Sequence, residues 1–162
     1  MPINVDNIKF YAPLNADDSL QTYGGGIDLS SEIVSDQLGN VFDNVSDQER
    51  IEGNTDFRKF FIYNHNSGAG SAWLNVKGWI WQNTLSGDDE ISIAIGTDSD
   101  THYEAAGYTF YKPDAIDHQD VLDIGTLLTN EKVAIWIKRI VGAEAAKYFA
   151  NEFRLAFKSG PS

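Results

Sequence analysis

Hydrophobic side chains recur at every second position through most of the chain after residue 56, and this period constrains the fold more than any other feature. A repeat of two residues is that of a β-strand with one face buried and the other facing solvent. Several strands of this kind must pack their apolar faces against one another. The alternating residues that we expect in the core are Ile91, Ile93, Ile95, Val133, Ile135, Ile137, Phe153, Leu155 and Phe157.

The order of these segments predicts the fold class. Clusters of Gly, Asn, Asp and Ser separate the strands, and no long helical segment lies between them, so the strand–helix–strand rhythm of parallel sheets is absent from the pattern. Only residues 143–150 have helical composition, over about two turns. We therefore predict an all-β protein, an antiparallel β-sandwich of immunoglobulin-like or jelly-roll type over residues 56–162, with at most that one short helix.

The first 55 residues differ from the rest of the chain. They contain the triple glycine Gly24-Gly25-Gly26, which disfavours the interior of an element, and only scattered apolar clusters. We interpret residues 1–55 as an extended N-terminal arm with one short strand near residues 8–14. On this interpretation a chain truncated near Thr55 should fold and lose binding. The alternative is that the segment packs across its own domain as a long connection.

Composition excludes several classes of function. The 162 residues include no cysteine, which excludes disulfides, thiolate catalysis and sulfur-ligated metal sites. The longest apolar run has about five residues, whereas a membrane-spanning helix needs about 20. The first residues lack the basic and apolar regions of a secretory signal. A net charge of −12 would repel nucleic acid and anionic membranes, so we expect neither as a partner.

The charge is unevenly distributed. Residues 1–129 carry 21 acidic and 6 basic side chains, whereas residues 130–162 carry 3 acidic and 6 basic ones. Two explanations are open: solvated faces of different sign, or docking in which the basic C-terminal strands meet acidic surface on another subunit. The second explanation predicts a homo-oligomer or binding to an acidic partner.

No catalytic motif is present, and we expect neither an enzyme nor a cofactor. The chain lacks a nucleophile elbow, a phosphate-binding glycine loop with lysine and a His-Glu-x-x-His motif. Asp98 and Asp100 are the two candidates for a calcium site, because they form an Asp-x-Asp start. Thr109 stands where the helix–loop–helix calcium motif has its glutamate, so we predict no metal.

Three tryptophans are an even number of residues apart in one expected strand. Trp73, Trp79 and Trp81 are expected on the same face, where they either pack against a second sheet or form an aromatic binding face for a sugar or a protein. The second possibility is that of a carbohydrate-binding sandwich module.

Several segments together resemble a known family. They are Tyr23-Gly24-Gly25-Gly26-Ile27, Asn40-Val41-Phe42-Asp43-Asn44-Val45-Ser46, Gly53-Asn54-Thr55-Asp56-Phe57-Arg58, Asn75-Val76-Lys77-Gly78-Trp79-Ile80, Val133-Ala134-Ile135-Trp136-Ile137-Lys138-Arg139 and Ala143-Glu144-Ala145-Ala146-Lys147-Tyr148. In this order they resemble small virion structural proteins of tailed bacteriophages, and the resemblance spans about residues 23–157.

The resemblance implies a non-enzymatic particle component that is made in the bacterial host cytoplasm and resides in the virion. The expected role is a capsid decoration or cement protein on the capsid exterior, bound to the major capsid protein. A tail, collar or baseplate protein, bound to other tail proteins, is the alternative. The residues that we expect to contact partners are Tyr11, Ile27, Leu29, Phe42, Lys138, Arg139 and Arg154.

Overall fold

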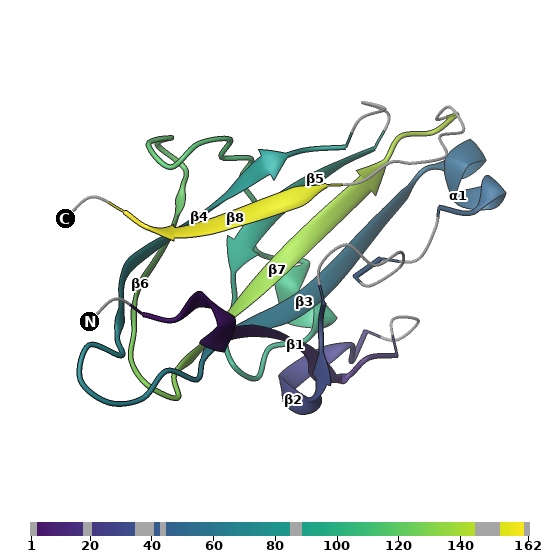
Figure 1. Cartoon of the computed structure of the whole chain (residues 1–162). Helices are drawn as coiled ribbons and strands as arrows, with labels where there is room; N and C mark the ends of the chain where they lie inside the picture. Colours follow the sequence, from purple (N-terminus) through teal and green to yellow (C-terminus); the bar gives the residue numbers. More distant parts are fainter. Residues whose placement is uncertain are drawn as a thin grey trace.

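Two antiparallel β-sheets stack face to face in a computed structural model of the protein (Figure 1). The structure describes residues 3–17, 21–34, 41–42, 45–84, 89–144 and 153–160. In chain order its elements are the 3₁₀ helix η1 (Val5–Asn7), β1 (Ile8–Asn15), β2 (Gly24–Glu32), α1 (Asp47–Glu52), β3 (Asn54–Asn64), β4 (Trp73–Gln82), β5 (Asp89–Ile95), α2 (His102–Ala105), β6 (Leu122–Leu127), β7 (Lys132–Val141) and β8 (Arg154–Ser159).

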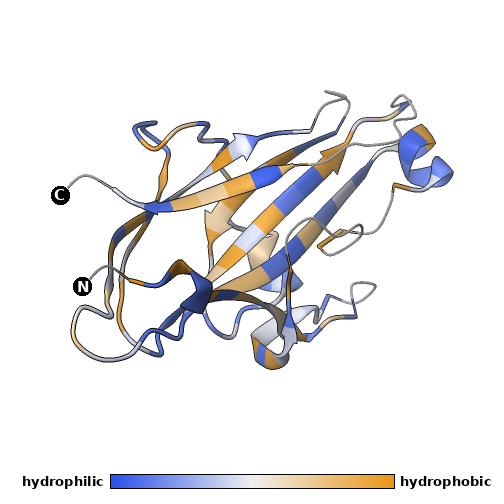
Figure 2. Ribbon diagram, viewed as in Figure 1, coloured by the Kyte–Doolittle hydropathy of each residue, from blue (hydrophilic) through white to orange (hydrophobic). Residues whose placement is uncertain are grey.

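The larger sheet has the strand order β2-β1-β3-β7-β5, and the smaller one has the order β6-β4-β8. The pair β3–β7 forms the centre of the larger sheet and runs in unbroken register from Asn54 opposite Val141 to Tyr63 opposite Lys132. Hydrophobic and hydrophilic residues alternate along both strands (Figure 2). The predicted all-β sandwich of antiparallel strands is confirmed.

The main core lies between the two sheets. It joins Phe60 and Ile62 of β3 and Ile135 and Ile137 of β7 to the inward residues of the smaller sheet. The residues from the smaller sheet are Trp73, Val76, Ile80, Leu122 and Leu127. Burying such aliphatic and aromatic side chains is the main source of stability for a sandwich, at about 1.5–3 kcal/mol for each.

Eight of the nine residues expected in this core pack there, and one does not. Ile91, Ile93, Ile135 and Ile137 are at most 1% exposed, and Val133, Phe153, Leu155 and Phe157 are partly buried against them. Ile95 is 39% exposed, so its predicted place in the core is wrong. The reason is that Ile95 ends β5 beside a surface hollow lined by Tyr111 and Leu122 rather than beneath a strand of the smaller sheet.

The opposite face of the larger sheet is also covered. Its outward residues include Lys59 and Phe61 of β3 and Trp136 of β7, all at most 1% exposed. The segment after β5, which contains α2, packs on this face with Tyr23, and Ala105 contributes to the same cluster. Two smaller hydrophobic clusters thus lie outside the main core, one with Phe61 and one with Trp136.

The N-terminal segment is part of the sandwich in its described residues, which corrects the expected extended arm. Residues Ile8 to Tyr11 of β1 pair with Asn64 to Phe61 of β3, and β2 pairs with β1. The triple glycine forms the start of β2. Glycine is required at Gly24, because its φ is +119° and a Cβ there would lie only 2.8 Å from the carbonyl oxygen of Asp100. The alternative prediction, that the N-terminal segment packs across its own domain, agrees with the positions of β1 and β2.

The helices of the described chain lie outside the segment whose composition predicted one. Two short helices, α1 and α2, stand in the described chain, and each begins with a capping box: Ser46 with Glu49, and Thr101 with Glu104. A capping box satisfies backbone N–H groups that a helix start leaves unpaired, which explains why such short helices form here. Most of the helix expected at residues 143–150 lies outside the described residues; Ala143 and Glu144 form a turn.

Candidate functional site

The outward face of the smaller sheet carries the most distinctive exposed side chains. Trp79 and Trp81 of β4 point away from the core, and Trp81 is 64% exposed. On the neighbouring strand β8, Ala156 lies opposite Trp79 and Lys158 opposite Lys77, and such opposed residues share one face of a sheet. We call the set Lys77, Trp79, Trp81, Arg154 and Lys158 the aromatic–basic face.

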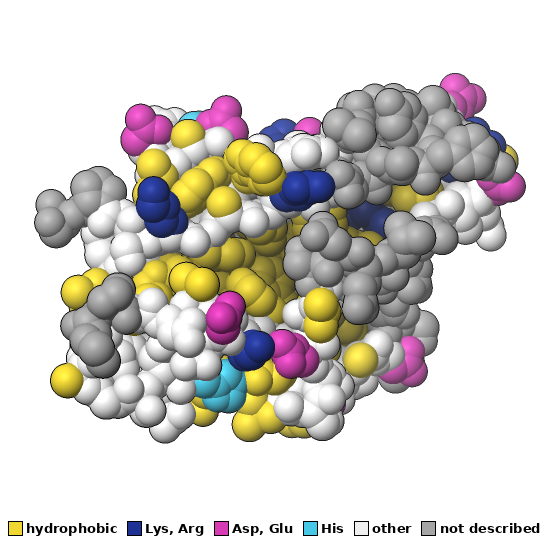
Figure 3. All heavy atoms as spheres, viewed as in Figure 1, with side chains coloured by type: hydrophobic (Ala, Val, Ile, Leu, Met, Phe, Trp, Pro, Cys, Tyr) yellow, Lys and Arg dark blue, Asp and Glu magenta, His cyan; other side chains and the backbone are white. Residues whose placement is uncertain are grey.

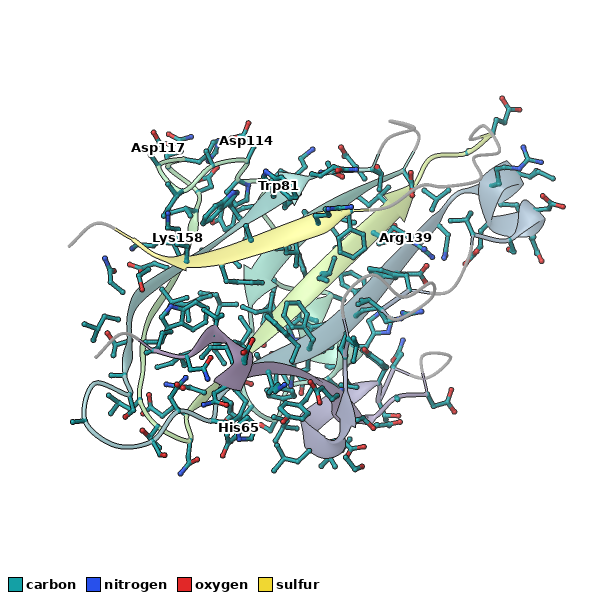
Figure 4. All side chains as sticks on the ribbon, viewed as in Figure 1. His65, Trp81, Asp114, Asp117, Arg139 and Lys158 are labelled. Carbon is teal, nitrogen blue, oxygen red and sulfur yellow. The ribbon has the colours of Figure 1, made fainter. Side chains whose placement is uncertain are left out.

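Basic and aromatic side chains contact each other on this face. The guanidinium carbon of Arg154 lies 5.6 Å from the centre of the Trp81 ring, which is the geometry of a cation–π contact. Lys77 forms an ion pair with Asp123 of β6 at 2.9 Å. Figure 3 shows hydrophobic atoms exposed between basic side chains over β8 and β4, and Figure 4 labels Trp81 and Lys158 there. A surface of this composition can bind an acidic partner and bury an indole.

Trp73 does not belong to this face, which corrects the expectation that all three tryptophans point the same way. It is 8% exposed and lies in the main core. The register of β4 shifts between Trp73 and Val76, and Asn75 has a φ of +50° there. A bulge of this kind inverts the parity of the strand, so Trp73 points inward whereas Trp79 and Trp81 point outward.

The metal candidates Asp98 and Asp100 are placed differently from each other. Asp100 is 4% exposed, and its Oδ1 lies 2.6 Å from Nζ of Lys59, whose side chain is fully buried. Asp98 is exposed and lies 3.6 Å from Lys132. Within the described residues, no group of three or more His, Asp and Glu side chains is placed to hold a metal ion. The carboxylate of Asp100 is engaged with a lysine instead.

The surroundings shift the pKa values of this buried pair. Burial acts to raise the pKa of the Asp100 carboxyl, but the contacts with Lys59, Tyr108 and the Thr97 N–H outweigh it, and the pKa is lowered. Burial lowers the pKa of Lys59 against the opposing effect of Asp100. Burial and the bond to Asp100 raise the pKa of Tyr108 to about 12, so this phenol is a hydrogen-bond donor at neutral pH.

Three of the residues expected to contact partners are buried by the chain itself. Tyr11 is 7% exposed, and its hydroxyl lies 2.6 Å from Nε2 of His65. Arg139 donates to Oδ2 of Asp56 at 2.8 Å and lies over the ring of Phe42, which is 8% exposed (Figure 4). Phe42 thus packs in the main core with Arg139 against its ring, and Tyr11 packs with Phe61 on the outward face of the larger sheet.

The other four keep some exposure. Ile27 packs partly against the cluster of Tyr11 and Phe61, and the ammonium of Lys138 lies 5.0 Å from the centre of the Phe110 ring. Leu29 of β2 is 56% exposed, and Arg154 is exposed on the aromatic–basic face. Leu29 and Arg154 come from different sheets, so the structure does not gather the expected contact residues into one site.

Two hollows open on the described surface. One, of about 520 Å³, is lined by Ile95, Tyr108, Tyr111 and Asp120 among others, and one of about 410 Å³ is lined by Asp98, Asn130 and Lys132 among others. Both are large enough for a small molecule, and neither has a histidine among its lining residues. No helix in the described part of the chain is long and apolar enough to cross a membrane.

Comparison with known proteins adds no identification. No protein-family model, curated protein or solved structure matches this chain.

Proposed function

We propose that the protein is a non-enzymatic structural component of a tailed bacteriophage particle, a decoration protein that binds the capsid exterior through its aromatic–basic face. The resemblance of residues 23–157 to small virion proteins supports the kind of particle. The observation that carries the contact is the exposed indole of Trp81, flanked by Arg154, on an outward sheet face.

Charge favours this use of the face. The protein carries a net charge of −12, which keeps it soluble and away from the packaged genome, while Arg154 and Lys158 mark a basic area on one side. The complementary partner is an acidic surface of the major capsid protein. Exposed tryptophan and arginine are the side chains that contribute most strongly to protein interfaces. Repeated contacts on a symmetric lattice allow a modest affinity for each copy.

The test is to count and locate the protein in purified particles by quantitative mass spectrometry and labelled imaging. Many copies spread over the head support decoration. A small symmetric set at the tail, collar or baseplate supports the alternative role, in which the partners are tail proteins. Absence from purified particles contradicts both.

A variant assigns the contact to the face. Trp81→Ala should fold normally, because the side chain is exposed, and should bind particles lacking the protein at least about tenfold more weakly. Tyr103→Ala is the matched control, since Tyr103 is 74% exposed on α2, outside this face. Equal binding by the two variants would contradict a role for the aromatic–basic face.

A carbohydrate-binding module is the second candidate. Trp79 and Trp81 are two residues apart on β4 and therefore lie on the same outward face of the sheet. A glycan array decides it. A sugar signal that Trp81→Ala abolishes would favour this function. An array without any signal would contradict carbohydrate binding.

A further inference from the structure

The buried pair Lys59–Asp100 is the most unusual chemical arrangement in the described chain. Lys59 lies on the outward face of β3, and Asp100 lies in the segment between β5 and α2, 41 residues further along. Both side chains are almost completely buried, at 0% and 3% exposure. Lysine and aspartate are rarely buried to this degree, because removing each charge from water costs several kcal/mol.

The two oxygens of the Asp100 carboxylate have different surroundings. Oδ2 accepts hydrogen bonds from the hydroxyl of Tyr108 at 2.6 Å and from the backbone N–H of Thr97 at 2.9 Å. Oδ1 lies 2.6 Å from Nζ of Lys59, yet within the described residues it has no partner in regular hydrogen-bond geometry. One oxygen is thus held by two donors, while the other lies in close contact with the Lys59 amine.

The amine is fixed in position by the backbone. Nζ of Lys59 donates to the carbonyl oxygen of Gly25 at 2.7 Å and to that of Asp100 at 3.1 Å. The rings of Phe61 and Trp136 lie 4.8 Å and 5.7 Å from Nζ, and they close the site on its apolar side. The amine therefore stays against the carboxyl group in a site that excludes solvent.

We propose that Lys59 and Asp100 condense to an intramolecular amide, an isopeptide bond between Nζ and Cγ. A proton first moves from the ammonium to Oδ1, which gives a neutral amine and a neutral acid. The nitrogen then attacks Cγ, and negative charge develops on Oδ2. The intermediate collapses with loss of Oδ1, which takes a second proton from the nitrogen and leaves as water.

This sequence balances without an oxidant, a reductant or a cofactor. An ammonium and a carboxylate yield one amide and one water. The N–H that remains on the amide nitrogen can donate to the Gly25 carbonyl, which already accepts from Nζ.

The site supplies what the condensation needs. The Tyr108 hydroxyl and the Thr97 N–H already donate to the oxygen on which charge develops, as in an oxyanion hole. Fixed contact between amine and carboxyl replaces an encounter in solution, and effective concentrations of well-oriented groups are very high. Burial lowers the pKa of Lys59, which favours loss of the ammonium proton, and a dry site shields the amide from hydrolysis.

The bond would join the segment after β5 covalently to the central strand β3. It would close a loop of 41 residues in the unfolded chain, which restricts that chain as a disulfide does. In a protein without cysteine this is a way to fix a surface segment permanently. The proposal concerns the fold and does not depend on the particle role.

The intact mass of the purified wild-type protein tests the proposal directly. We expect a mass lower than that of the sequence by one water molecule. A proteolytic digest should contain a branched peptide that joins the fragments with Lys59 and Asp100, and trypsin should not cleave after Lys59. A folded protein with the full sequence mass would overturn the proposal.

Two variants locate the bond. Lys59→Met should have its full sequence mass, because no amine is present at that position. Lys132→Arg is the matched control, since it alters the partly exposed pair with Asp98 and should keep the mass deficit of one water. A deficit that survives in Lys59→Met would place the loss of water elsewhere and overturn the assignment.

A third variant tests the donor to Oδ2. Tyr108→Phe should form the bond at least about tenfold more slowly after refolding, because one oxyanion donor is lost. Tyr111→Phe is the control, and it should react at the wild-type rate. Equal rates for all three proteins would overturn the role of Tyr108.

Discussion

At the scale of single residues, the two isoleucines Ile95 and Ile135 show how position decides the importance of a side chain. They are register partners on neighbouring strands β5 and β7. Ile135 is 0% exposed in the main core, whereas Ile95 is 39% exposed. We expect Ile135→Ala to lower the free energy of unfolding by about 2–5 kcal/mol and Ile95→Ala by less than about 1 kcal/mol. Urea denaturation measures both, and equal losses would contradict the described burial.

Tyr11 gives a residue-scale prediction with a pH dependence. Burial first, and then the charges of Glu32 and Tyr63, raise the pKa of the Tyr11 hydroxyl above its ordinary value. Because the pKa is raised, the folded state keeps the Tyr11 proton at pH values where the unfolded chain has lost it. The protonated hydroxyl therefore contributes its full stabilisation of the fold below the ordinary pKa of tyrosine. This contribution is lost as the pH rises through the pKa of the folded state.

The variant Tyr11→Phe isolates that effect. It removes the contact with His65 and should cost about 1 kcal/mol at neutral pH. The difference in unfolding free energy between wild type and variant should shrink on going to alkaline pH. Denaturant titrations at a series of pH values measure it, and a difference that grows with pH would refute the interpretation.

At the scale of elements, the segment that follows β5 depends on close approach to the larger sheet. A Cβ on Gly96 would lie 2.5 Å from the Trp136 ring and 2.8 Å from Oδ2 of Asp100. Gly96→Ala should therefore destabilise the protein by about 1–3 kcal/mol through overpacking. Gly107→Ala is the matched control, because its Cβ would meet nothing closer than 3.5 Å. Thermal unfolding compares the two, and similar midpoints would show that the segment packs loosely.

Much of the element pattern follows from the sequence, and the exceptions have physical causes. Alternation places Ile91, Ile93, Ile135 and Ile137 correctly, because a strand with one buried face leaves that period in any sequence. Alternation cannot show that Trp73 points inward, since a bulge at Asn75 inverts the parity. The capping boxes at Ser46 and Thr101 are local signals that predict helix starts, and reading them would have located α1 and α2.

The candidate sites are less predictable than the strands. Trp79 and Trp81 can be found from parity, but whether that face is covered depends on how the two sheets stack. The pair of Lys59 and Asp100 joins positions 41 residues apart, and nothing local to either residue indicates the other. Contacts of this kind arise from the chain path through Gly24 and Gly25, which brings three segments together.

At the scale of the whole molecule, the N-terminal segment determines whether the sandwich is complete. Phe10 of β1 lies 6.1 Å from both Phe60 and Phe157, measured between ring centres, so it touches both sheets. Its strand also covers the edge of β3, where Phe61 and Ile62 are fully buried. An uncovered edge with apolar residues promotes aggregation.

A chain that begins at Gly53 therefore should not fold as an independent domain, contrary to the expectation from sequence. It lacks β1 and β2, which exposes the edge of β3 and part of the main core. We expect it to bind a hydrophobic dye and to lose cooperative unfolding in denaturant. Adding a peptide of residues 3–34 should restore cooperative unfolding, because that peptide carries both missing strands, and a peptide with Tyr11 and Phe10 changed to Ser is the control. A truncated chain that unfolds at the wild-type midpoint without the peptide would contradict this prediction, since it would mean that residues 3–34 add nothing to the stability of the sandwich.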